Sequence, residues 1–142
     1  PLLMEKTQQQ QTPFLGICLG MQLMTKSSEE GKLPGLGWFD ATTNRFDAAR
    51  LNTGEKIPHM GWAQVAIKKE HALTQNLGDL PRFYFVHAYH VVCHNPSDAL
   101  LTTHYGYDFV SALSRNHIMG VQFHPEKSHR FGMQLLHNFS KL

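Results

Sequence analysis

The sequence predicts an α/β fold, and three observations indicate it. A short apolar run at 13–18 leads directly into a helix-like segment at 19–31. Segments rich in aromatic and β-branched residues follow between 59 and 125, which is typical of strands. The chain then closes with apolar residues at helical spacing. Because 142 residues with 42% hydrophobic content suffice for one core, residues 1–142 are predicted to form a single domain.

The first elements are a strand, a sharp turn and a helix. The run PFLGIC (13–18) is nearly continuous in apolar residues, the pattern of a strand buried on both faces. LGMQLMTKSSEEG (19–31) fits a short helix closed by Gly31, and KSSEEGK within this region is interpreted as a solvated helix end and turn. The segment 33–50 then mixes turn residues with aromatics, and HMGWAQVAIKK (59–69) carries a strand in its second half.

The second half of the chain predicts strands and one closing helix. RFYFVHAYHVVC (82–93) should form strand structure that breaks near Ala88. ALLTTHYG, FVSALSRN and HIMGVQFHP are typical of successive strands of a meander that ends at Pro125. From Ser128 onward an amphipathic helix is predicted by the spacing of Phe131, Leu135, Phe139 and Leu142.

Composition and charge exclude several classes of function. The formal net charge is +2, and the Lys and Arg residues are scattered, so we expect no nucleic-acid partner. Cys18 and Cys93 are too few for a disulfide framework, which favours reduced thiols and a cytoplasmic location. No apolar run approaches the roughly 20 residues that cross a bilayer. We therefore expect no membrane partner.

The stretch FLGICLGMQ places Cys18 between two glycines at the predicted strand-to-helix turn. G-x-C-x-G is the thiol counterpart of the nucleophile elbow, in which flanking glycines such as Gly16 and Gly20 avoid collisions around a strained nucleophile. A helix N-terminus at this point should favour the thiolate, and the Leu19 backbone N–H could donate to a developing oxyanion. The alternative interpretation is a buried structural cysteine in a glycine-rich turn.

A candidate base lies near the other end of the chain. GVQFHPEKS puts His124 at the exit of a predicted strand, with Glu126 two residues later. A cysteine nucleophile needs an imidazole within hydrogen-bond reach, and the imidazole needs an acceptor that fixes its tautomer. His124 alone could be an ordinary turn histidine beside a solvated Glu126, but together with Cys18 the two residues favour a catalytic Cys-His-Glu triad.

The ten histidines also raise the question of a metal site. The densest group is His87, His90, Cys93 and His94, but His87 and His90 would face opposite sides of a strand. The chain contains no C-x-x-C or H-E-x-x-H spacing. We therefore expect no metal, and we expect Cys93 to pack as a small apolar residue.

GICLGMQ (16–22) and VQFHPE (121–126) together resemble the two signature segments of class I glutamine amidotransferases. The resemblance implies a three-layer, flavodoxin-like α/β fold with a central mixed sheet. It also implies that a Cys-His-Glu triad releases ammonia from glutamine. Cys18 matches the nucleophile, His124 the general base and acid, and Glu126 the orienting carboxylate.

The same resemblance implies which residues contact the substrate glutamine. Gln22 lies one helical turn past the nucleophile, at a position that contacts glutamine in the family. The segment VHAYHV matches the stretch whose main chain holds the amino-acid end of the substrate. The implied substrate-binding residues are Leu19, Gln22, Ala88 and Tyr89. Glutamine is then the small-molecule partner, and no cofactor is implied.

Two further stretches, EEGKLPGLGWFDATTNRF and KIPHMGWAQV, resemble the glutaminase subunits of imidazole glycerol phosphate synthases in histidine biosynthesis. In that group, ammonia passes to a cyclase subunit with a (β/α)8 barrel, so a heterodimer is implied. His59, Met60 and Trp62 are candidate interface residues, since Met and aromatic residues are favoured at interface cores. Alternatively, Met60 and Trp62 fill the core of this chain.

The start of the chain departs from the family pattern. PLLMEKTQQQQT reads as the last turns of a helix and a polar connector, and the chain begins at Pro1 without Met. The family opens with further strands and a Pro-Gly-x-Gly loop, which nothing before Phe14 matches, so we expect an N-terminally truncated domain that lacks these strands. Two alternatives to the glutaminase subunit therefore stay open: a non-catalytic module that only docks a partner, and a stand-alone cysteine hydrolase of γ-glutamyl bonds.

Overall fold

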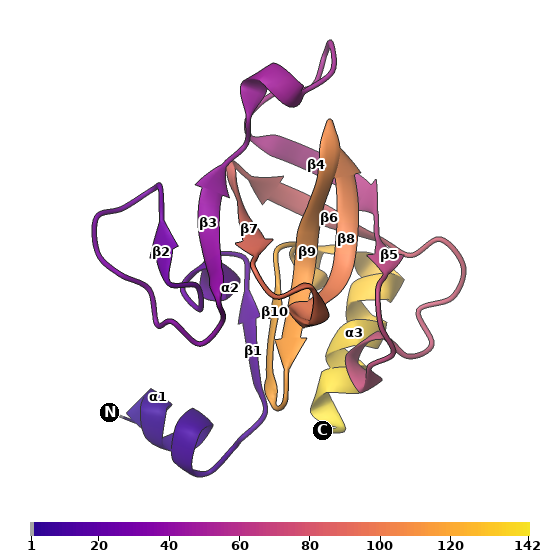
Figure 1. The fold of residues 1–142 in the computed structure, drawn as a ribbon. Coiled ribbons are helices and arrows are strands. Elements are labelled where there is room, and N and C mark those ends of the chain that lie inside the picture. The colour runs from indigo at the N-terminus through magenta and orange to yellow at the C-terminus, as the bar shows by residue number, and fades with distance from the viewer. Residues whose placement is uncertain (1) are drawn as a thin grey trace.

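A curled mixed sheet is the framework of the computed structural model, which describes residues 2–142 (Figure 1). Its main path runs β1-β10-β9-β7-β3-β2, with β8 beside β9 and β5 beside β8, while β4 and β6 form a separate antiparallel pair. The pairs β1/β10 and β2/β3 are parallel, and the other pairs are antiparallel. The strands are β1 (Phe14–Ile17), β2 (Ser27–Ser28), β3 (Ala41–Arg45), β4 (His59–Gln64), β5 (Ala66–Ile67), β6 (Arg82–His87), β7 (Tyr89–Cys93), β8 (Ala99–Tyr105), β9 (Tyr107–Arg115) and β10 (Ile118–Val121).

In the described part of the chain three α-helices accompany the strands, namely α1 (Leu2–Met4), α2 (Leu19–Gln22) and α3 (His129–Ser140). A π-helical turn at Glu5–Gln9 continues α1. This confirms the prediction of helical turns before a polar connector. Between residues 2 and 142 the chain forms no helix of the length and apolarity that crossing a membrane would need. Pro1, with which the predicted helical turns begin, lies outside the described residues.

The predictions for the second half of the chain are confirmed. The strand structure breaks at Ala88 between β6 and β7, and the meander appears as β8, β9 and β10. The closing helix α3 begins directly after Ser128 and buries Phe131 and Leu135. Leu142 lies beyond the end of α3 and is exposed, so the apolar stripe of the helix ends at Phe139.

The predictions for the first half are partly wrong. The expected helix 19–31 is a single turn, because the Thr25 hydroxyl donates to the Gln22 carbonyl and the chain then enters β2. Segment 33–50, interpreted as turns, contains β3, where two threonines favour extended backbone. β1 is half-buried rather than buried on both faces because, among the described residues, it pairs only with β10.

Alternating residues of β10 face two separate cores. Met119 and Val121 pack with α3, whereas Ile118 packs with α2 on the opposite face. Gly120 also faces α2, where a Cβ atom would lie 2.8 Å from the Met21 side chain. The α2 side contains Met21, Met24, Phe39, Ala41, Val91, Leu113 and Ile118. The two helices therefore cover opposite faces of the sheet, which confirms the three-layer α/β architecture.

A pair of buried histidines lies in the core on the α3 side, and it corrects one expectation. His59 is 4% exposed and stacks on Phe85 and Tyr105, so it cannot contact a partner as predicted. Its position follows from the alternation of β4, which turns His59 inward and Met60 outward. His59 Nδ1–H donates to His87 Nε2 at 3.0 Å, and His87 Nδ1–H donates to the Tyr89 carbonyl at 2.8 Å.

We expect this histidine pair to make the fold sensitive to acid. Burial lowers the pKa of His59 to about 4 and that of His87 to about 3, whereas both titrate near 6.5 when unfolded. Below pH 6.5 the unfolded chain therefore binds more protons, and stability falls by about 2 kcal/mol per histidine by pH 5. Urea unfolding at pH 7 and pH 5 measures this loss. His59→Phe should remove about 2 kcal/mol of this loss, and the whole loss should persist in His104→Gln, which alters an exposed histidine.

Candidate active site

Parallel pairing of β1 with β10 brings the two predicted catalytic segments to one edge of the sheet. Ile17 aligns with Val121, so Cys18 leaves β1 where the VQFHPE segment leaves β10. The Cys18 backbone N–H donates to the Val121 carbonyl at 2.8 Å, and the Cys18 carbonyl accepts from Met21 and Gln22 at the start of α2. Cys18 has φ 54° and ψ −107°, a positive-φ conformation that is costly for a residue with a Cβ. This is the strained strand-to-helix elbow that the sequence predicts.

The two glycines of the elbow play different roles. A Cβ atom on Gly16 would lie 2.7 Å from the Gly20 backbone and 2.6 Å from the end of the Met24 side chain. A Cβ atom on Gly20 would meet nothing within 4 Å. The close approach of strand and helix therefore requires glycine only at position 16.

Gly16→Ala should destabilise the fold by about 1–3 kcal/mol, because the added methyl group collides with backbone atoms that cannot move freely. Gly20→Ala is the matched control: it adds the same methyl group in open space and should leave stability equal or slightly higher. Urea unfolding midpoints of the two variants test this difference. Equal stabilities would show that the elbow is not closely packed at Gly16.

His124 and Glu126 form an ion-pair geometry directly after β10. His124 Nδ1 lies 3.2 and 3.3 Å from the two Glu126 carboxylate oxygens, which leaves Nε2 as the free ring nitrogen. The His124 backbone N–H donates to the Tyr84 carbonyl of β6, and the Ser128 hydroxyl donates to the His124 carbonyl at 2.6 Å. The Tyr84 N–H in turn donates to the Ser128 hydroxyl oxygen. The histidine is thus anchored on both sides by backbone contacts that do not occupy its ring.

The surroundings of Cys18 do not favour its thiolate, contrary to the prediction. Burial raises its pKa above the ordinary value, and the carboxylates of Glu126 and Glu30 raise it further. The Leu19 backbone N–H and the Gln122 side chain lower the pKa but do not compensate. A one-turn helix such as α2 contributes little of the dipole that the sequence analysis invoked. Proton removal by a base is therefore needed for reactivity at neutral pH.

Two buried glutamine side chains lie beside the thiol. Gln122 Nε2 is 3.7 Å from Cys18 Sγ, and Gln122 Oε1 accepts from Gln22 Nε2 at 3.0 Å. Gln22 Nε2 also donates to the Tyr89 carbonyl at 3.1 Å. The neighbouring Ala88 carbonyl accepts from the Phe46 backbone N–H, directly after β3. Among residues 2–142, the side-chain hydrogen bond of Cys18 is therefore with Gln122, which the sequence analysis did not single out, and not with His124.

A cavity of about 440 Å³ opens next to the elbow. Leu19 and Gln22 line one side, and the loop carrying Glu30 lines the other. Glu30 is not predicted by the sequence because KSSEEGK is typical of a solvated helix end. In the structure α2 ends early, and this segment folds back over the cavity. The cavity thus combines two predicted substrate-binding residues with a carboxylate.

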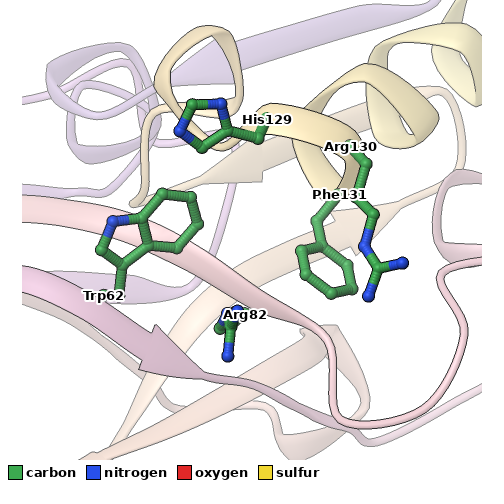
Figure 2. Close-up of a pocket in the computed structure, with 5 residues that line it drawn as sticks. All are labelled: Trp62, Arg82, His129, Arg130 and Phe131. Atoms are coloured by element: carbon green, nitrogen blue, oxygen red, sulfur yellow. The ribbon is translucent and has the colours of Figure 1, made fainter.

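A second cavity of about 550 Å³ lies between the β4/β6 pair and the start of α3 (Figure 2). The Trp62 ring stacks on His129 with centroids 5.4 Å apart. Figure 2 shows Arg82 below Trp62, and Phe131 and Arg130 on the facing helix. This cavity is aromatic and basic, and its helical side begins five residues after His124.

The histidines considered for a metal site are placed differently from the prediction. His87 and His90 both pack on Phe46, with ring centroids 5.1 and 4.8 Å away, because the strand breaks at Ala88 and alternation is lost. The expectation that they face opposite sides is wrong. Within the described part of the chain, no three His, Cys, Asp or Glu side chains are grouped as metal ligands would be.

Comparison with known proteins identifies the same family as the two signature segments do. The profile of the class I glutamine amidotransferase family matches residues 1–142. The chain is 52% identical over 140 residues to imidazole glycerol phosphate synthase subunit HisH 2 of Methanococcus maripaludis, covering 99% of this chain and 68% of that protein. It is 45% identical over 141 residues to subunit HisH 2 of Pseudomonas aeruginosa, again covering 99% and 68%.

Solved structures show the same fold. A glutamine amidotransferase of Thermotoga maritima superposes with a TM-score of 0.63 at 21% identity, covering 99% of this chain and 52% of that chain. A protein of Thermoplasma acidophilum assigned to GMP synthase gives a TM-score of 0.63 at 21% identity, covering 89% and 55%. The chain thus spans about two thirds of the length of the HisH relatives and about half of these structures. It belongs to the class I glutamine amidotransferase family, in the group of the HisH subunits of imidazole glycerol phosphate synthase.

Proposed function

We propose that this chain is the glutaminase subunit of an imidazole glycerol phosphate synthase and that Cys18, His124 and Glu126 are its catalytic triad. His124 Nε2 takes the thiol proton, and the sulfur attacks the carboxamide carbon of glutamine. The Glu126 carboxylate holds Nδ1–H and stabilises the imidazolium that forms. The observation that carries the proposal is the β1/β10 register, which delivers the elbow and the HPE segment to one sheet edge.

The same groups complete the reaction. The Leu19 backbone N–H, which already lies against the sulfur, donates to the oxyanion of the tetrahedral intermediate. His124 returns its proton to the leaving nitrogen, so that ammonia departs and a thioester remains on Cys18. Water activated by His124 then hydrolyses the thioester and releases glutamate. Each proton taken from a nucleophile is returned to a leaving group.

We propose that the cavity beside the elbow binds glutamine. Both N–H groups of the Gln22 amide are engaged, by Gln122 Oε1 and by the Tyr89 carbonyl, so Gln22 Oε1 is the atom left to accept from the substrate. The Glu30 carboxylate supplies a negative charge for the substrate ammonium group. The Tyr89 carbonyl holds the Gln22 amide from the β7 side, whereas Ala88 bonds Phe46 and neither residue lines the cavity.

Glu30→Gln should raise the KM for glutamine by about 10- to 100-fold with little change in kcat, because it removes a charge that binds substrate and transition state equally. Glu29→Gln is the matched control, since Glu29 accepts from the Arg45 backbone and does not line the cavity. Steady-state glutamate release at varied glutamine concentration measures both constants. A KM shift of the same size in both variants would contradict the role of Glu30.

We further propose that the ammonia passes to a cyclase subunit with a (β/α)8 barrel, and that residues 1–142 act as one domain in this complex. The relatives named above are subunits of imidazole glycerol phosphate synthase, which supports this partner. Met60 and Trp62 are 62% and 43% exposed on β4, and Trp62 borders the cavity of Figure 2. We propose these two residues, without His59, as interface contacts.

Glutamate release in the presence and absence of the cyclase subunit tests the proposed function. We expect hydrolysis that depends on Cys18 and rises when the cyclase and its substrate are added. Equal hydrolysis with and without the cyclase would favour the stand-alone hydrolase. Cyclase binding without any glutamate release would favour the non-catalytic docking module.

A further inference from the structure

Gln122 occupies a position that connects the nucleophile to the substrate cavity. It is wholly buried at the end of β10, and its backbone N–H donates to the Ser111 carbonyl at 2.8 Å. Its side chain reaches Cys18 Sγ on one side and Gln22 on the other. A buried amide is costly to desolvate, so its placement beside the thiol calls for a physical role.

The orientation of the Gln122 amide is determined by its neighbours. Gln22 Nε2 donates to Gln122 Oε1, so the donor end of the Gln122 amide must face Cys18. Gln22 is itself held, because its second N–H donates to the Tyr89 carbonyl. That carbonyl also accepts from His87 Nδ1–H. A continuous set of hydrogen bonds thus runs from the histidine pair in the core to the sulfur.

We propose that Gln122 is a positioning residue for the cysteine: its amide N–H holds the Cys18 side chain in one orientation and stabilises the thiolate that forms when the proton leaves. The inference rests on Cys18 being the nucleophile of the proposed function. The Gln122 side chain also lowers the pKa of the Cys18 thiol, in opposition to burial and to the carboxylates of Glu126 and Glu30. Gln22 acts on the sulfur through Gln122, in addition to facing the substrate cavity.

The test is the pH profile of Cys18 alkylation by iodoacetamide in the full chain, followed by peptide mass spectrometry. Thiolate is the reacting form, so the profile reports the ionisation of Cys18 without any need for glutamine. Gln122→Leu should shift the midpoint upward by about half to one pH unit and slow alkylation below the midpoint by about three- to tenfold. Gln134→Leu alters a half-buried glutamine of α3 that bonds Asn138, and it should leave the profile unchanged.

A double-variant comparison separates positioning from packing. If Gln22 acts through Gln122, Gln22→Leu shifts the midpoint in the same direction, and the double variant shifts it no further than Gln122→Leu alone. Additive shifts of the alkylation midpoint would contradict the claim that Gln22 acts on the sulfur through Gln122. An unchanged midpoint in Gln122→Leu, with an unfolding midpoint equal to that of the wild type, would overturn the proposal.

Two further readouts keep the outcome decisive. Should Gln122→Leu fail to fold, Gln122→Met keeps a side chain of similar length and removes the donor without adding a charge, so the midpoint should still rise. In the glutaminase assay, Gln122→Leu should lower kcat by about tenfold, a larger factor than any rise in KM. If wild-type Cys18 alkylates but glutamine is not hydrolysed, the proposed function fails while the alkylation comparison still decides the role of Gln122.

Discussion

Replacing Cys18 with alanine should reduce glutamine hydrolysis by at least about 10⁴-fold, because no other group in the elbow can form the thioester intermediate. Among the described residues, Cys18 belongs to neither hydrophobic core, and its side-chain hydrogen bond is with the Gln122 amide. The unfolding midpoint should therefore change little. Glutamate release, measured with the cyclase subunit present, compares the variant with the wild type.

The second cysteine provides the matched control. Burial raises the pKa of the Cys93 thiol to about 11, with Asp98 contributing, so this thiol is almost fully protonated at neutral pH. Cys93→Ala should retain glutamine hydrolysis within about twofold of the wild type. Loss of activity in Cys93→Ala, or more than a tenth of the wild-type rate in Cys18→Ala, would contradict the assignment of the nucleophile.

Replacing His124 with alanine should lower kcat by about 10³-fold, within the range that loss of a general acid–base group produces. The effect should be large here because burial and two nearby carboxylates disfavour the Cys18 thiolate, so the thiol depends on a base. Raising the pH should recover part of the lost rate in His124→Ala, since hydroxide then ionises the thiol.

The control for His124 is His104→Ala, which alters an exposed histidine paired with Asp108 on the β8/β9 hairpin. This variant should hydrolyse glutamine at the wild-type rate. If His124→Ala retains more than a tenth of the wild-type kcat at neutral pH, the base must be another group. Cys18 alkylation in His124→Ala would then show whether the thiol is ionised independently of the imidazole.

The parts of the site that the sequence predicted are those encoded in short contiguous stretches. The elbow requires only a strand, a glycine at position 16 and a turn, so FLGICLGMQ indicates Cys18 directly. The His124–Glu126 contact spans two residues and follows from the HPE turn alone. The closing helix is also predictable from the sequence, because α3 packs on one core and therefore shows a regular apolar stripe.

The parts that the sequence did not predict depend on contacts distant along the chain. The Gln122 side chain donates a hydrogen bond to Cys18, which lies 104 positions earlier in the chain. The two residues meet because β1 pairs in parallel with β10. The length of α2 could not be predicted because local hydrogen bonds of Thr25 compete with helical ones. His59 was expected at a surface because β4 shows no sequence signal of which face is inward.

The role of Cys18 is tested by peptide mass spectrometry of the chain, with its cyclase partner, after exposure to a diazo-ketone analogue of glutamine. We expect one covalent adduct, located on Cys18, that forms more slowly in the presence of excess glutamine and is absent from Cys18→Ala. Labelling of Cys93 instead, or labelling of Cys18 that glutamine does not slow, would contradict the claim that Cys18 is the nucleophile of a glutamine-binding site.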